Sequence, residues 1–380
     1  MRVDDPKAEA YARQSPMKWK HLLRYPIDRR NAQKALQNDP PVHSDWPNVG
    51  LQLASDRLLI DGARHLACLA IAAEQCRHRI VLRCNRVLLA AIAHKRLGKL
   101  FLSRPNVRWI SPRTSFDRCA LALSDSQADA REALRVIRLL VGRDAPEGLP
   151  ALPYPMHPKQ MLRWDESIAN RLRSSAKAGI FFAGNQKARY GRDEMTRRFD
   201  VMPRLEILAT LQSAFGDRIS ESVSVADDHS IVLQDSQKHP IAESDWFGTL
   251  SRHRFFVCCP GAAQPMCHNV IESMACGVVP ILEYAHRFSV PLEDGKNAIC
   301  FRGPEGLVQA IRRIDTLDES EFRGLQSRTV DYFEKQLRSD STFRHIVQNA
   351  TVSAIAMPFH DRNLYEDSML PNSRIDRLAS

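Results

Sequence analysis

Apolar residues along this chain follow two alternating patterns, one typical of helices and one typical of strands. Apolar residues at three- and four-residue spacing predict helices over 66–73 and 87–94. Short apolar runs predict strands over 50–54, 79–83 and 107–110. Strands that alternate with helices in this way are typical of a parallel sheet with crossover helices. The N-terminal half of the chain therefore predicts an α/β domain.

The same patterns are weaker toward the ends of this half. They predict a strand over 119–124 and a helix around 131–140. The first fifty and the last thirty residues show no periodicity from which an element can be predicted.

A proline-rich stretch separates this half from a second α/β pattern. Five prolines fall within residues 146–158, where neither a helix nor a central strand would tolerate them. We predict an N-terminal domain over 1–160 and a C-terminal domain over 161–350. The tail over 351–380 is left open, with a return to the N-terminal domain as one option.

The C-terminal half resumes with a buried strand over 178–183, which Gly184 and Asn185 interrupt. An apolar stripe then predicts a helix over 205–215, with Gly216 as its stop. Two further helices are expected over 304–314 and 319–336.

Length and composition agree with two folded domains. The chain has 380 residues, more than one hydrophobic core usually organises, and 44% hydrophobic with 26% charged residues is typical of globular proteins. The longest apolar runs, 66–73 and 87–93, are far shorter than the roughly 18 residues that span a bilayer. With no apolar leader segment either, we expect a cytoplasmic protein.

The cysteine content and the net charge bear on the class of protein and on its possible partners. The nine cysteines are an odd number without a Cys-x-x-Cys pair, which favours free thiols over disulfides or structural zinc. The net charge of +10 would favour binding to nucleic acid, to an anionic membrane surface or to a phosphorylated substrate. A general preference for surface arginine would explain the charge equally well.

Several well-known motifs are absent from the sequence. No Gly-x-Gly occurs, so the dinucleotide fingerprint is missing, and the Gly-x4-Gly at Gly179 and Gly184 lacks the Lys and Ser/Thr of a P-loop. No Gly-x-Ser-x-Gly, His-Glu-x-x-His or Asp-x-Asp occurs either. We therefore expect neither a cofactor nor a catalytic metal.

The most informative segment is 255–282, which predicts strand, loop, helix and strand. The helix would begin near Cys267, His268 and Asn269, whose unpaired N–H groups would make an anion site at the carboxyl edge of a parallel sheet. Glu272 would lie one turn inside this helix, where it could accept hydrogen bonds from a ribose diol. The alternative for Glu272 is a capping or core-edge carboxylate.

These residues resemble a known family. Gly261, Gln264, Glu272, the run 273–277 and Val279-Pro-Ile are similar to the donor-binding signature of GT-B glycosyltransferases. The resemblance extends over roughly 50–330, and the spelling of 260–269 is also similar to exostosin-like and bacterial surface-polysaccharide transferases. It implies an α/β fold of two Rossmann-like, doubly wound parallel-sheet domains that face a cleft, the C-terminal one binding a nucleotide-sugar.

The resemblance also implies roles for individual residues. Lys187 and Arg189 would replace a metal as cations on the leaving diphosphate, unless they are simply solvated loop cations. Asp61 and His65 would be candidates for a general base, unless they are a helix-end charge and a helix-face histidine. His239 is a weaker candidate for a base or a phosphate contact. The implied donor-binding residues are Gly184, Asn185, Gly261, Gln264, Cys267, His268, Asn269 and Glu272.

One position departs from the family pattern. Where the family's two-glutamate motif has its first Glu, this chain has Gln264, which can hydrogen-bond a sugar but cannot stabilise a positively charged ring. Retention or inversion of the anomeric configuration therefore stays open, and a member that binds without turnover is an alternative.

The resulting hypothesis is a metal-independent glycosyltransferase that uses a nucleotide-sugar donor in polysaccharide or lipopolysaccharide biosynthesis. Its acceptor would be a glycan or a lipid-linked glycan, and the positive charge would draw the protein to the anionic inner face of a membrane. A nucleotide-sugar epimerase of the same fold is the first alternative. A basic nucleic-acid-binding protein is the second, although no binding motif supports it and no nucleic-acid partner is expected.

Overall fold

The computed structural model describes residues 19–37, 45–116, 119–126, 133–142, 149–222 and 227–358. The chain divides into two compact units. Unit 1 comprises Met1–Leu152 and Ser339–Ser380, and unit 2 comprises Pro153–Arg338. The division between them falls inside the proline-rich stretch, at Leu152 rather than at residue 160, and the chain leaves unit 2 at Arg338 rather than at residue 350.

Unit 1 is built on a parallel sheet of six strands in the order β12-β5-β4-β1-β2-β3. Neighbouring strands in this order pair in parallel, and β1 lies between β4 and β2. The elements of unit 1 are α2 (Trp19–Gln37), β1 (Asn48–Gln52), α3 (Arg64–Gln75), β2 (Arg79–Arg83), α4 (Arg86–His94), α5 (Arg96–Leu102), β3 (Val107–Ile110), β4 (Cys119–Ser124), β5 (Arg135–Val141), α14 (Ser339–Gln348) and β12 (Ala354–Met357).

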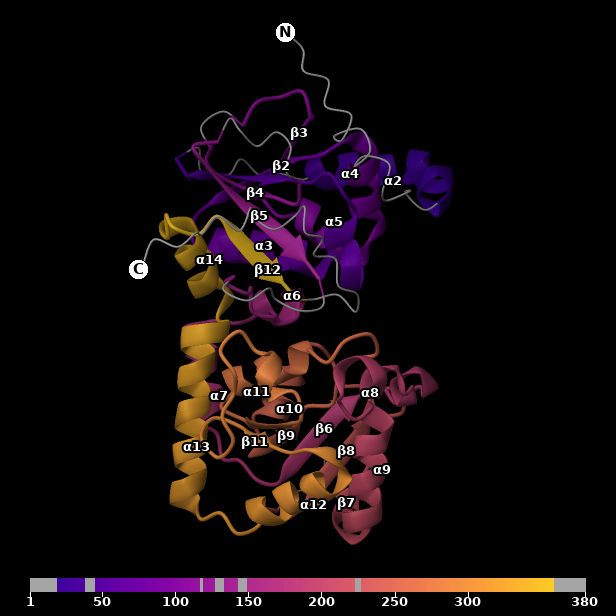
Figure 1. The fold of residues 1–380 in the computed structure, drawn as a ribbon, viewed down its shortest axis with the longest axis vertical. Helices are drawn as coiled ribbons and strands as arrows, with labels where there is room; N and C mark the ends of the chain where they lie inside the picture. The colour runs from indigo at the N-terminus through magenta and orange to yellow at the C-terminus, as the bar shows by residue number, and fades with distance from the viewer. Residues whose placement is uncertain are drawn as a thin grey trace, which may run out of the picture. The chain divides into compact units, whose positions relative to one another are not determined.

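The C-terminal part of the chain completes unit 1. β12 adds a strand beside β5, with Ala354 paired to Arg138 and Met357 to Val141 (Figure 1, yellow beside magenta). The helix α14 packs on α3, and the ring of its Phe343 meets the ring of His78, three residues beyond the end of α3, edge to face with centroids 5.4 Å apart. The sheet of unit 1 therefore depends on two segments that lie far apart in the sequence.

One prediction in unit 1 is wrong, and two elements of unit 1 were not predicted. The segment expected as a helix around 131–140 contains the strand β5 (Arg135–Val141), because a short, largely apolar strand has no period that separates it from a buried helix. The helix α2 was not predicted, and it carries Pro26 in its interior. The strand β12 was not predicted either, since four residues are too few to show a period.

Unit 2 contains a second parallel sheet of six strands, in the order β11-β10-β9-β6-β8-β7. Here too, neighbouring strands pair in parallel. The elements of unit 2 are α6 (Pro158–Met161), α7 (Glu166–Ser174), β6 (Ile180–Gly184), α8 (Glu194–Phe199), α9 (Arg204–Phe215), β7 (Ile219–Ser220), β8 (Ile231–Asp235), α10 (Trp246–Leu250), β9 (Phe255–Val257), α11 (His268–Ala275), β10 (Val279–Leu282), β11 (Ile299–Cys300), α12 (Gly303–Ile314) and α13 (Glu319–Tyr332).

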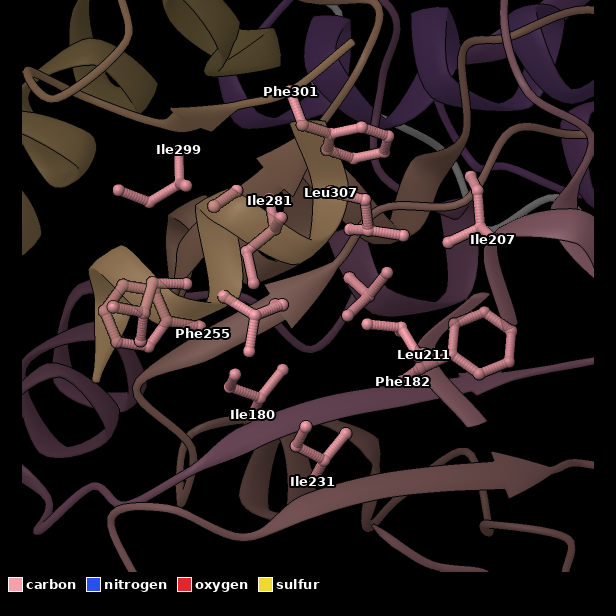
Figure 2. Close-up of a cluster of buried hydrophobic side chains, with 14 of the residues drawn as sticks. Ile180, Phe182, Ile207, Leu211, Ile231, Phe255, Ile281, Ile299, Phe301 and Leu307 are labelled. Atoms are coloured by element: carbon pink, nitrogen blue, oxygen red, sulfur yellow. The ribbon is translucent and has the colours of Figure 1, made fainter. Parts of the chain in front are cut away.

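Alternate residues of the unit 2 strands bury opposite faces of the sheet. Ile180 and Phe182 of β6 enter an apolar cluster that α9 and α12 cover with side chains such as Leu211 and Leu307 (Figure 2). On the opposite face, Phe181 stacks on His253, with ring centroids 4.4 Å apart. Strands buried on both faces are typical of doubly wound sheets. The predicted fold class, two Rossmann-like α/β domains, is confirmed for each unit taken by itself.

The state of the cysteines and the character of the helices can both be read from the structure. All nine cysteines are free thiols, as predicted, although Cys76, Cys267 and Cys300 are only partly buried. In the part of the chain that the structure describes, no helix is long and apolar enough to cross a membrane.

Candidate functional site

The candidate site lies at the carboxyl edge of the unit 2 sheet. There β6 is flanked by β8 on one side and by β9 on the other, so the loops that follow β6 and β9 leave neighbouring strands. In open α/β sheets, ligands bind in the crevice outside the strand ends where the strand order reverses. These two loops, 184–191 and 258–267, are therefore the first place to look for a ligand.

The loop after β6 carries four of the predicted site residues. At Gly184 a Cβ would lie 2.9 Å from Cζ of Phe182, so a side chain there would require the Phe182 ring to shift. The Asn185 side chain accepts a hydrogen bond from the Lys187 amide at 2.9 Å and so shapes the turn. Lys187 and Arg189 are both exposed. As cations in solvent they would be screened by salt.

The loop after β9 is a tight turn built on Gly261. A Cβ at this position would lie 2.7 Å from the carbonyl oxygen of Gln264, so glycine is required there. The predicted residues Gln264 and Cys267 lie in the same loop, and Cys267 is partly buried. The turn brings the chain to the start of α11, as the sequence predicted.

The helix α11 begins at His268, and its N-cap residue Cys267 makes no capping hydrogen bond with its side chain. The side-chain amide nitrogen of Asn269 donates a hydrogen bond to the carbonyl of Ala183 at 3.3 Å, which ties this helix to the end of β6. The ring of His268 meets the ring of His157 edge to face, with centroids 5.4 Å apart. His157 was not singled out from the sequence, because it lies more than a hundred residues away.

Glu272 is 1% exposed and serves two donors of unit 2. Its Oε1 accepts a hydrogen bond from the His157 amide at 2.8 Å, and its Oε2 accepts one from the Trp246 indole at 2.6 Å. These contacts match the alternative interpretation of Glu272 as a core-edge carboxylate. A ribose diol could reach it only after the segment around His157 moves away.

Arg204 is a residue of this site that the sequence analysis missed. It is the first residue of α9 and is 6% exposed. Its guanidinium donates to the carbonyls of Asn185 at 2.8 Å and Pro260 at 2.9 Å, so it joins the loops after β6 and β9. The centroid of the Tyr190 ring lies 3.9 Å from its Cζ. A cation at the first position of a helix that carries a strong apolar stripe was the signal that could have found it.

The two predicted base candidates lie in unit 1. Asp61 adopts a left-handed backbone conformation just before α3, and its carboxylate pairs with Arg64 at 2.6 Å. His65, on the first turn of α3, is 6% exposed, and burial lowers the pKa of its imidazole to about 3. His65 is therefore neutral at pH 7 and a weak base, whereas Asp61 is exposed.

An acidic residue that the sequence analysis passed over shapes the edge of the unit 1 sheet. Asp125, directly after β4, accepts hydrogen bonds from the amides of Ala54 and Ser55 at 2.7 and 3.0 Å, and from the Ser55 hydroxyl at 2.7 Å. Burial raises the pKa of this carboxyl. Asp125 thus fixes the loop after β1 at the place where the strand order of unit 1 reverses.

The remaining candidate, His239, is exposed after β8. Its carbonyl accepts a hydrogen bond from the side-chain amide of Gln234 at 2.7 Å, which is a turn contact. Within the described ranges, no group of three or more His, Cys, Asp or Glu side chains is arranged to hold a metal ion.

Comparisons with known proteins return solved structures and nothing else. No protein-family model and no curated protein sequence matches this chain. A glycosyltransferase from Rickettsia africae matches with a TM-score of 0.46 and 9% identity, over 80% of this chain and 98% of that one. HepE of Anabaena in complex with UDP matches with a TM-score of 0.42 and 10% identity, over 80% and 98% of the two chains.

An epimerase is also among the similar structures. A putative UDP-N-acetylglucosamine 2-epimerase from Listeria monocytogenes matches with a TM-score of 0.37 and 9% identity, over 79% of this chain and 94% of that one. The chain is thus similar over most of its length to solved glycosyltransferases and to an epimerase. The fold of each unit rests on its own strand order.

Proposed function

We propose that the protein is a glycosyltransferase whose unit 2 binds a nucleotide-sugar and whose unit 1 binds the acceptor. The observation that carries this proposal is the strand-order reversal of unit 2, where Arg204 joins the loops after β6 and β9. The loop after β9 turns at Gly261 and leads into the N-terminus of α11. Backbone amides at such a helix start favour a phosphate group.

The proposed chemistry is loss of a nucleoside diphosphate from the sugar without a metal. The first amides of α11, with the exposed Lys187 and Arg189 of the loop after β6, would stabilise the negative charge that develops on the leaving diphosphate. Gln264 would hydrogen-bond the transferred sugar. The ribose role of Glu272 stays part of the proposal, with the condition that the His157 segment moves.

An inverting reaction would also need a base for the acceptor hydroxyl. Of the two candidates in unit 1, Asp61 suits this role better, because burial leaves His65 with a pKa of about 3.

We propose a glycan or a lipid-linked glycan as the acceptor, such as a lipopolysaccharide precursor. The net charge of +10 supports binding to an anionic surface, and failure to pellet with anionic vesicles at low salt would refute that part.

The proposal is tested by nucleoside diphosphate binding. We expect one of UDP, GDP, ADP, dTDP or CDP to raise the melting temperature by several degrees, since a ligand at 100 times its dissociation constant adds about 2.7 kcal/mol. EDTA should leave the shift unchanged. Absence of any shift would refute the proposal, and a shift that EDTA abolishes would refute metal independence.

A control distinguishes transfer from epimerisation. The nucleotide-sugar with the stabilising base is incubated with and without a lipid-linked acceptor, and the products are separated. Release of nucleoside diphosphate only with the acceptor supports transfer. Conversion of the nucleotide-sugar without any acceptor would mean that the enzyme is an epimerase.

A further inference from the structure

Charge is distributed unevenly along unit 1. Between Glu74 and Asp117 the sequence contains ten Lys or Arg residues and no Asp or Glu. This segment forms β2, α4, α5 and β3, and the strands β2 and β3 lie together at one end of the sheet. Of its cations, Arg104 pairs with Glu74 at 2.5 Å. The end of the unit 1 sheet that β2 and β3 form therefore carries an excess of positive charge.

The carboxylates at the carboxyl edge of this sheet belong to other loops. Asp56 and Asp61 follow β1, and Asp125 follows β4. Asp125 accepts hydrogen bonds from two backbone amides of the loop after β1. The residues directly after β2 and β3, 84–86 and 111–114, include no Asp or Glu. The carboxyl edge thus divides into a part that contains carboxylates, after β1 and β4, and a basic part, after β2 and β3.

Two exposed arginines occupy equivalent positions in this basic part. In the parallel pair of β2 and β3, Arg83 lies opposite Ile110. Arg86 and Arg113 each follow three residues later, on neighbouring loops at the carboxyl edge. Neighbouring strands lie about 4.8 Å apart, which is within the reach of one ligand. Both arginines are exposed, and within the described ranges neither forms a hydrogen bond or an ion pair through its side chain.

Two hydrogen bonds hold these loops together. Nη1 of Arg83 donates to the carbonyl of Thr114 at 3.1 Å, which ties the loop after β3 to β2. The indole of Trp109 donates to the carbonyl of Cys84 at 3.0 Å, which ties the loop after β2 to β3. The backbone that carries the two exposed arginines is therefore fixed before a ligand binds, which lowers the entropic cost of binding.

The position of Arg86 is unfavourable for a cation in the absence of a ligand. Arg86 is the first residue of α4, and the side chain of the preceding Asn85 accepts a hydrogen bond from the Leu88 amide at 2.8 Å. The partial positive charge at the start of a helix disfavours a cation there. A bound anion beside Arg86 would offset this repulsion.

We propose that Arg86 and Arg113 bind an anionic acceptor, a glycan that carries carboxylate or phosphate groups. A planar guanidinium binds the oxygens of either group in pairs. That the bound glycan is the acceptor depends on the proposed function. The proposed base Asp61 follows β1, the neighbour of β2, so the positive charge would draw such a glycan to the edge of the sheet that carries this base.

The same surface lacks features that two other anionic partners use. In residues 76–116, all of which the structure describes, no large apolar side chain is exposed. A helix that binds a membrane buries apolar side chains in the lipid, and single-stranded nucleic acids stack on aromatic rings. The half-buried Trp109 donates its indole N–H to Cys84. An acidic glycan needs neither feature.

The test measures glycan binding to the full chain by calorimetry, at 0.15 M ionic strength. Hexagalacturonate is the carboxylate probe, and pentamannose bearing a 6-phosphate is the phosphate probe. We expect at least one of them to bind, and the fully methyl-esterified hexagalacturonate, which has no charge, not to bind. The double variant Arg86→Gln/Arg113→Gln should weaken binding at least tenfold. The probe that binds more tightly identifies the anionic group.

A second double variant is the matched control. Arg29 and Arg77 are exposed arginines of unit 1, on α2 and before the amino end of β2. Arg29→Gln/Arg77→Gln removes the same charge, yet it should change the affinity less than threefold, because the Debye length is about 8 Å at this ionic strength. An equal loss in both double variants would assign binding to net charge and overturn the proposal. Wild-type protein that binds neither probe would overturn it as well.

Two further titrations separate the partners and the proposals. If duplex DNA or anionic vesicles bind more tightly than both glycans, and Arg86→Gln/Arg113→Gln abolishes that binding, the surface belongs to that partner and the acceptor assignment is overturned. If a glycan binds through the two arginines while no nucleoside diphosphate binds, the glycan site stands and the transferase function falls. If a nucleoside diphosphate binds and neither glycan does, the function stands and the glycan site falls.

Discussion

At the scale of single residues, chemistry in this protein depends on partners that are distant in sequence. Glu272 looks like a ligand-binding carboxylate in the linear motif, yet its oxygens accept hydrogen bonds from residues 115 and 26 positions away. Arg204 looks like an ordinary helix residue, yet its partners lie 19 and 56 positions away. The roles of both residues are decided by their neighbours in space.

We predict that Glu272→Gln destabilises unit 2. An amide has one acceptor oxygen, so its NH2 group would face either the His157 amide or the Trp246 indole, donor against donor. The expected loss is about 1–3 kcal/mol in the free energy of unfolding, measured in urea.

A double-mutant cycle is the control for Glu272. Trp246→Phe removes one of the two donors, so Glu272→Gln should cost less in that background than in wild type. If Glu272→Gln unfolds like wild type but abolishes nucleoside diphosphate binding, Glu272 is a ligand residue and its two contacts are incidental.

At the scale of elements, helix ends were the best predicted feature. Gly216 was expected to stop the helix over 205–215, and it is the C-cap of α9. Gly277 follows α11 in the left-handed conformation, at a φ of +67°. Glycine is favoured there because it has no Cβ to clash. The strand β5 was predicted as a helix, because its apolar residues alone do not separate a strand from a buried helix.

Three glycines provide a test of this argument. Gly277→Ala adds both backbone strain and a contact at 3.3 Å with Gln326, so we expect a loss of about 1–2 kcal/mol in stability. Gly295→Ala, at a φ of +68° with open space around it, should show the strain alone. Gly216→Ala, at a φ of −55°, should be neutral or slightly stabilising. Urea midpoints that are equal for all three would contradict the assignment of left-handed strain.

At the scale of the whole molecule, the chain is not two successive domains. Unit 2 is one continuous segment, whereas unit 1 is closed by residues that follow unit 2. Arg135 of β5 donates hydrogen bonds to the carbonyls of Ile346 and Asn349, which fastens this C-terminal segment to the sheet.

We predict that truncation after Arg338 destabilises unit 1 and spares unit 2. Loss of β12 exposes the edge of β5, and loss of α14 uncovers α3. In differential scanning calorimetry, the unfolding transition of unit 1 should move to a lower temperature or be lost to aggregation, and the transition of unit 2 should be unchanged. Truncation after Pro358 keeps both elements and is the control. If truncation after Arg338 left the unfolding transition of unit 1 unchanged, this dependence would be contradicted.

The sequence by itself determined the α/β class, most of the strands and helices, and the strand–loop–helix–strand segment at the candidate site. It could do so because a helix or strand with one buried side repeats its apolar residues at a fixed spacing along the sequence, and because glycine marks turns. Only the tertiary structure decided that Arg204 joins the two loops, that Glu272 is enclosed by His157 and Trp246, and that β12 closes unit 1. The physical reason is that such contacts follow from which strands become neighbours in a sheet, and no local pattern along the chain encodes that order.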